Sequence, residues 1–152
     1  MMALTTFVSQ NRGAKEYKRA RKGAHFGLVC SVSLAETIGL LIALFATPLM
    51  RLFVDDPKVI QYGVERAHYA TILFFLLAYS HGVSAVLRGV GKSVIPMVVM
   101  LVCWCLVRVT LLTMLNMLFH NIVFVYLVYP FTWSLSSITF FIYYHRVDWL
   151  HA

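Results

Sequence analysis

The stretch 94–118, VIPMVVMLVCWCLVRVTLLTMLNML, decides the fold class of this chain. Its only charged side chain is that of Arg108. A helix needs about 20 predominantly apolar residues to cross the hydrocarbon core of a bilayer, and this stretch is long enough. A helix also pairs its own backbone N–H and C=O groups, for which hydrocarbon offers no hydrogen-bond partners. We therefore predict a transmembrane helix here.

Three other stretches have the same character, namely 25–46, 68–87 and 122–144. The apolar part of residues 1–11 is about half as long as a span, and we expect it to be the last turns of another helix. The composition agrees, because 61% of the 152 residues are hydrophobic and 12% are charged. Soluble domains are roughly half apolar and a quarter charged. We predict an all-α, polytopic transmembrane helical bundle with four full transmembrane helices and a partial N-terminal one.

Turn signals separate these spans. Pro48 is expected to stop the first full span. Asp56 followed by Pro57 is typical of a helix N-cap and the first helical residue. A helix should therefore begin there and lead, through the more polar segment 57–66, into the next span. Residues 89–93, GVGKS, are predicted to form a tight loop.

The basic residues are distributed unevenly among the loops. Six of the thirteen Lys and Arg residues lie between residues 12 and 22. With Arg88, Lys92 and Arg146 they put nine basic residues on one side of the membrane, against three on the other. Since cytoplasmic loops carry the excess of Lys and Arg, we expect this side and the C-terminus to be cytoplasmic, in a plasma (inner) membrane. No nucleic-acid partner is expected, because no basic face or recognition fold accompanies the charge.

The sequence contains no pattern typical of a metal site, a disulfide framework or an enzyme. Its three cysteines, Cys30, Cys103 and Cys105, all lie within apolar runs, and an odd number argues against a set of disulfides. Cys103 and Cys105 are two residues apart, so they point to different faces of a helix. We predict no metal site and no catalytic activity.

Four short stretches resemble the multidrug and toxic compound extrusion (MATE) family of transporters. Residues 7–14, FVSQNRGA, are similar to its Q-N-x-G-A motif, and residues 48–57, PLMRLFVDDP, to its external P-L-x-x-L-F-x-D-D-P segment. Residues 87–91, LRGVG, resemble its L-R-G-x-G loop, and residues 104–108, WCLVR, its W-x-x-x-R motif. The resemblance covers almost the whole chain. It implies structural roles for the residues that carry it: Gln10, Asn11, Gly13, Arg88, Gly89, Gly91 and Trp104.

The resemblance also implies an architecture and an activity. Members of the family have two six-helix lobes around a substrate chamber, and residues 1–152 match the end of the eighth helix through the twelfth. We therefore expect part of a C-terminal lobe, whose partners are lipid and a missing N-terminal lobe or complementary chain. The implied activity is export of small organic cations or drugs in exchange for protons or sodium, with no cofactor and not by this fragment alone. The alternatives are a non-transporting helical membrane subunit and a lipid-linked oligosaccharide flippase of the same superfamily.

Glu36 and Arg108 are the first candidates for a role in coupling or in the transport pathway. Glu36 is the only carboxylate within a predicted span, and burying it in hydrocarbon is costly unless it is protonated or paired. It either couples transport to a cation or is satisfied by nearby hydroxyls or another helix. Arg108 should face the bundle or an aqueous cavity, as a structural anchor or as a substrate or gating contact. A Glu36–Arg108 pair would satisfy both groups.

His81 and Tyr79 are further candidates, both in the span 68–87. Histidine can transfer protons near neutral pH, although interface and packing roles are the alternative. One face of the last span could border the chamber; its residues are Tyr126, Tyr129, Trp133, Ser137 and Phe140.

Overall fold

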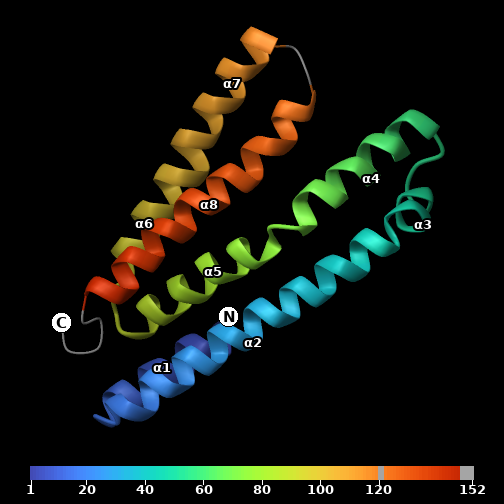
Figure 1. The fold of residues 1–152 in the computed structure, drawn as a ribbon. Coiled ribbons are helices and arrows are strands. Elements are labelled where there is room, and N and C mark those ends of the chain that lie inside the picture. The colour runs from blue at the N-terminus through green and yellow to red at the C-terminus, as the bar shows by residue number, and fades with distance from the viewer. Residues whose placement is uncertain (120–121, 148–152) are drawn as a thin grey trace.

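The computed structural model describes residues 1–119 and 122–147, and these residues form helices joined by short connections, with no strand among them (Figure 1). The order of the helical elements is α1 (Met2–Gly13), α2 (Tyr17–Leu44), α3 (Ala46–Arg51), α4 (Pro57–Thr71), α5 (Phe74–Gly89), α6 (Val94–Met100), the π-helical segment η1 (Leu101–Val107), α7 (Arg108–Phe119) and α8 (Ile122–Arg146). The predicted all-α class is confirmed.

Three helical runs are long and apolar enough to cross a membrane without a break. They are α2, the run α6–η1–α7 over Val94–Leu118, and α8 over Val125–Arg146. The helices α4 and α5 are long and apolar enough to cross a membrane only when they are taken together as a pair. The described chain therefore has three candidate spans, or four if the pair is one span, and it is a multi-pass membrane protein.

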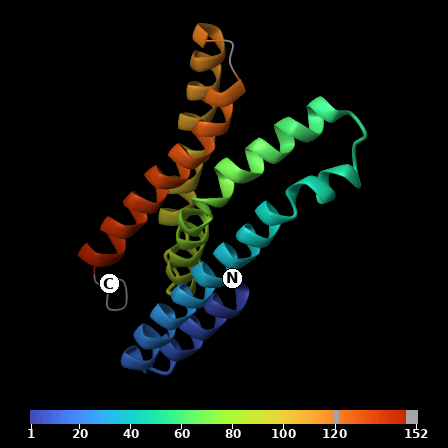
Figure 2. The ribbon, with the colours of Figure 1, turned by 45° about the vertical axis from the view of Figure 1, so that its right-hand side comes forward.

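The helices form one bundle with α5 near its centre. The α5 helix contacts α1, α2, α6 and α8, whereas α2 runs along both α4 and α5 (Figures 1 and 2). The α8 helix packs between α5 and the α6–η1–α7 run. The best-buried apolar side chains belong to α1, α2, α5 and α8: Val8, Ala24, Val83, Val86, Leu87 and Phe140.

The predicted span 68–87 is bent in the structure, because α4 ends at Thr71 and α5 begins at Phe74, with a bend of 57° between them. The segment contains no proline or glycine near the break, so its own sequence gives no local signal for it. Two contacts from α2 hold the bend. The buried Thr71 hydroxyl donates to the carbonyl of Ala67 in its own helix, at 2.7 Å, and lies 3.3 Å from the carbonyl of Gly39 of α2. Glu36 accepts from the backbone of α5.

The predicted basic loop 12–22 is also shorter than expected. Gly13 ends α1 and Tyr17 begins α2, and the turn between them is completed by Lys15 with a φ of 61°. The basic residues 18–22 therefore belong to the first turns of α2. They remain at the same end of the bundle as the α5–α6 loop and the end of α8 (Figure 1).

Two predicted turn structures are confirmed. The Asp56 side chain accepts a hydrogen bond from the backbone N–H of Lys58, at 2.9 Å, and Pro57 is the first residue of α4. After α5, the loop 89–93 turns at Gly91, whose φ of +80° is readily adopted by glycine. The N–H of Lys92 donates to the carbonyl of Leu87, at 2.9 Å, which closes a Schellman-type helix end.

Candidate functional site

A cavity of about 510 Å³ lies beside the α4–α5 bend, between these two helices and the wall formed by η1, α7 and α8. Small residues of α4, among them Ala67 and Ala70, form one side. The opposite side is aromatic and basic. The chemistry of the whole cavity depends on its polar and aromatic side chains, of which the first belongs to α4: Arg66, His81, Trp104, Arg108, Tyr129 and Trp133.

Arg108, a predicted site residue, is held in this cavity by two hydrogen bonds. Its Nε and Nη2 atoms donate to the Thr132 hydroxyl of α8, at 3.2 and 2.7 Å. Its guanidinium carbon lies 5.3 Å from the centre of the Trp104 ring and 4.7 Å from that of Tyr129. Trp104 and Arg108 are four residues apart, so the helix places both on one face. Arg108 is thus oriented by a hydroxyl and two aromatic rings.

A second guanidinium reaches the same aromatic ring. Arg66 of α4 is exposed, and its guanidinium carbon lies 5.1 Å from the centre of the Tyr129 ring. Arg66 was not among the predicted site residues, because it lies in the more polar segment 57–66, before the predicted span 68–87. Arg66 and Ala70 are four residues apart and so share a face of α4, but nothing in the sequence marks that face as the side of a cavity.

His81 also lines the cavity, next to Trp104. The two rings meet edge to face with their centres 5.1 Å apart. The indole N–H of Trp104 points to the Ser136 hydroxyl of α8, at 3.3 Å. The structure therefore brings three of the sequence-predicted residues, His81, Trp104 and Arg108, into one cavity.

A network of buried serines between α5 and α8 supports this wall. The Ser80 hydroxyl lies 3.0 Å from that of Ser136 and 2.8 Å from that of Ser137. Ser137 in turn donates to the carbonyl of Leu76, at 2.7 Å. All three serines are buried. The network fixes α8 against α5 and so fixes the aromatic wall, and the sequence analysis did not single out Ser80 or Ser136.

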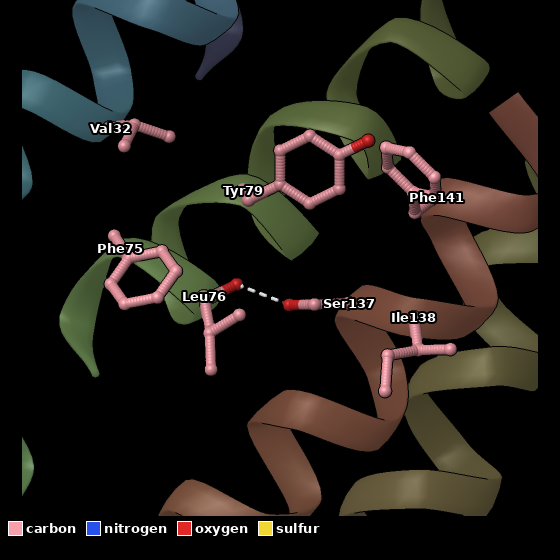
Figure 3. Close-up of a pocket in the computed structure, with 7 residues that line it drawn as sticks. All are labelled: Val32, Phe75, Leu76, Tyr79, Ser137, Ile138 and Phe141. Carbon is pink, nitrogen blue, oxygen red and sulfur yellow. Dashed lines mark hydrogen bonds between the residues drawn. The ribbon is translucent and has the colours of Figure 1, made fainter. Parts of the chain in front are cut away.

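Tyr79 lies elsewhere. It borders a separate apolar pocket of about 340 Å³ between α2, α5 and α8, which Val32, Phe75 and Phe141 also line (Figure 3). Tyr79 and His81 are two residues apart on α5, so they point to different faces of the helix. Of the α8 residues expected to border the chamber, Tyr126, Tyr129 and Trp133 line the 510 Å³ cavity, whereas Ser137 lines the apolar pocket and Phe140 is packed in the core.

Glu36 and Arg108 do not pair. The Glu36 Oε2 atom accepts a hydrogen bond from the backbone N–H of Phe75, at 3.1 Å, in the first turn of α5. Arg108 instead bonds Thr132. The carboxylate therefore caps the helix that begins at the bend, where backbone N–H groups have no partner within their own helix.

The residues that carry the Q-N-x-G-A and L-R-G-x-G motifs meet at the contact between α1 and the end of α5. The Arg12 guanidinium donates to the carbonyl of Val90, and the Asn11 side chain donates to the carbonyl of Phe7, at 2.7 Å. A Cβ atom on Gly89 would lie 2.8 Å from the carbonyl oxygen of Thr5. The side chains of Gln10 and Arg88 are exposed. These motifs form a helix contact rather than part of the cavity.

Within the described ranges 1–119 and 122–147, no three His, Cys, Asp or Glu side chains gather as metal ligands. The chemistry available in the cavity is therefore that of two guanidinium groups, one imidazole and aromatic rings.

Comparison with known proteins assigns a family. Residues 1–114 match the family model described as MatE. A stretch of 98 residues is 29% identical to the probable multidrug resistance protein NorM of Thermotoga maritima. A stretch of 97 residues is 28% identical to the protein of the same description from Chromobacterium violaceum. Each alignment covers 64% of this chain and 21% of the relative, so the aligned part spans about a fifth of these proteins.

Proposed function

Because this chain belongs to the MatE family, we propose that it is part of a multidrug efflux transporter that exchanges its cargo for protons or sodium ions. It acts as a carrier and not as an enzyme, and it needs no cofactor beyond the coupling ion. The observation that carries the proposal is the cavity beside the α4–α5 bend, which gathers His81, Trp104 and Arg108. Its volume, about 510 Å³, falls in the range of small-molecule sites, which is about 300–1,000 Å³.

The proposed place of the chain is the outer part of a C-terminal lobe, in contact with lipid and with an N-terminal lobe or a complementary chain. Its exposed apolar side chains support contact with lipid, and they are numerous on α2 and on the 94–118 run: Leu34, Ile38, Leu41, Met97, Leu101 and Leu106. The proposed location is the plasma membrane with the end of α8 in the cytoplasm. The first turns of α2, the α5–α6 loop and the end of α8 support this orientation, because they carry basic residues and lie at one end of the bundle (Figure 1).

Glu36 remains the proposed coupling carboxylate. Its hydrogen bond to Phe75 connects the ionisation of one side chain with the first turn of α5. A carboxylate interacts favourably with the positive end of a helix, and a protonated carboxyl does so less. Binding of a proton at Glu36 would therefore loosen the bend that borders the cavity. His81 is the second proposed proton carrier, because it lines the cavity itself.

A chimera tests the proposal. The segment of the Thermotoga maritima relative that corresponds to this chain is replaced by residues 1–152, so that every residue that lines the cavity is included, and the chimera is expressed in bacteria that lack their own drug pumps. We expect efflux of ethidium, which collapses with a protonophore or on removal of sodium. The control carries Glu36→Gln, which removes the proposed coupling carboxylate, and should reach the membrane in equal amount with reduced efflux. A chimera that is present in the membrane but exports no drug would favour the non-transporting subunit.

A further inference from the structure

The charge of the 510 Å³ cavity is unusual for a site that is expected to receive organic cations. Arg66 and Arg108 both line it, and no lining side chain in the described part of the chain is a carboxylate. A cationic ligand in this cavity would face two positive groups without a compensating acid. An anionic group would be attracted by both.

The two guanidinium groups contact the same aromatic ring and lack a protein counter-ion. Both lie over the Tyr129 ring, at 5.1 Å for Arg66 and 4.7 Å for Arg108, so their separation cannot exceed the sum of these distances. Among the described residues, the hydrogen-bond acceptor of Arg108 is the neutral hydroxyl of Thr132. Within residues 1–119 and 122–147, neither arginine forms an ion pair. Both arginines therefore have N–H donors available for a ligand.

Guanidinium groups and rings together select one kind of ligand. Arginine binds a carboxylate through two parallel N–H donors, which fixes the plane of the acid. The Trp104, Tyr129 and Trp133 rings offer an aromatic partner offset-stacked or edge-to-face contacts. The small side chains of Ala67 and Ala70 leave space opposite these rings.

We propose that this cavity binds aromatic carboxylates, with the acid on Arg66 and Arg108 and the ring system against Tyr129 and Trp104. The exposed Arg66 meets the acid first, and the half-buried Arg108 holds it. The inference rests on the proposed function only in treating the ligand as cargo. The binding preference itself does not require transport.

Calorimetric titration of the full chain in lipid nanodiscs tests the inference with three probes of the same ring system: naphthalene-2-carboxylate, naphthalene-2-carboxamide and 2-naphthylmethylammonium. We expect the carboxylate to bind at least tenfold more tightly than the neutral amide, and the ammonium to bind most weakly. Arg66→Gln and Arg108→Gln should each remove most of the preference for the carboxylate and leave binding of the amide unchanged. Arg51→Gln, on α3 and outside the cavity lining, should change neither.

Three results would overturn the inference: equal binding of the acid and the amide, tighter binding of the ammonium, or a carboxylate preference that survives in both arginine variants. Arg66 is exposed, so its variant remains informative even if Arg108→Gln fails to fold. If the unaltered chain showed no preference for the carboxylate while the chimera exported drug normally, this inference alone would be contradicted. If the chain preferred the carboxylate but the chimera exported no drug, the proposed function alone would be contradicted.

Discussion

Glu36 on α2 accepts a hydrogen bond from the backbone N–H of Phe75, 3.1 Å away, in the first turn of α5. The two residues are 39 positions apart in sequence, and the contact ties α2 to the bend between α4 and α5. The first N–H groups of a helix have no partner within that helix, and hydrocarbon offers none, so an acceptor from a neighbouring helix is an available solution. The carboxylate that seemed costly in the sequence thus has a structural partner.

Replacement of Glu36 should separate the hydrogen bond from the charge. Glu36→Ala removes the acceptor and should lower the free energy of unfolding by about 1 kcal/mol, the usual effect of losing a helix cap. Glu36→Gln keeps a carbonyl acceptor and should lose less than half as much. Unfolding in a mixed detergent, followed by circular dichroism, measures both. Equal losses in the two variants would mean that the hydrogen bond to Phe75 contributes nothing.

Gly89 should tolerate no side chain, because α1 packs directly on it. A Cβ atom there would lie 2.8 Å from the Thr5 carbonyl oxygen and 2.9 Å from the Val8 Cβ atom. Backbone atoms cannot move aside as a flexible side chain can, so Gly89→Ala should cost about 1–3 kcal/mol, as overpacking does. Gly13→Ala is the matched control, since nothing lies within 4 Å of its Cβ position.

The measurement for the two glycine variants is thermal unfolding in the same detergent. We expect a lower midpoint for Gly89→Ala, and for Gly13→Ala an unchanged or higher midpoint, because alanine favours helix over glycine. A similar midpoint for both variants would contradict the close approach of α1 to α5.

The sequence predicts those features that depend on neighbouring residues. The cap at Asp56 and the turn at Gly91 depend only on residues that are adjacent in sequence, so both could be predicted. The apolar run around Arg108 predicts a span by its length alone. Trp104 and Arg108 share a face because they are four residues apart, so part of the cavity wall was also predictable.

The rest depends on contacts between distant segments. The break after Thr71 has no proline or glycine to announce it, and its stabilising partners, Glu36 and Gly39, belong to α2. Arg66 precedes the predicted span, and only its contact with Tyr129 of α8 shows that it belongs to the cavity. A polar side chain within a span can find several partners, and only the packing of the helices decides between them.

Thr132 should be coupled energetically to Arg108. Thr132→Val keeps the shape of the side chain but removes the hydroxyl that accepts from Nε and Nη2. Loss of this acceptor should cost about 1–3 kcal/mol, because a partly buried charged donor is left without a partner. Thr132→Ser restores the acceptor and should recover most of the loss.

A double-mutant cycle with Arg108→Met measures the coupling. When Arg108 is already absent, Thr132→Val should have little effect, so the interaction energy should be about 1 kcal/mol or more. Additive effects of the two substitutions would show that the hydroxyl acts independently of the guanidinium.

Ser80 and Ser84 provide an internal comparison on one helix. Both are fully buried on α5, but the Ser80 hydroxyl bonds Ser136 and Ser137, whereas that of Ser84 has no partner among the described residues. Hydrogen bonds between helices in a membrane protein are worth about 0.6 kcal/mol on average and up to about 1.7. Ser80→Ala should therefore be destabilising by an amount in this range.

Ser84→Ala removes a hydroxyl that gains nothing from burial, so it should be neutral or stabilising. Because Trp104 donates to Ser136, Ser80→Ala should also disturb the aromatic wall and shift the tryptophan fluorescence, and Ser84→Ala should not. Unfolding midpoints and emission spectra of the two variants, recorded in the same detergent, measure both effects. If Ser84→Ala were the more destabilising of the two, the serine network could not be what holds α8 against α5.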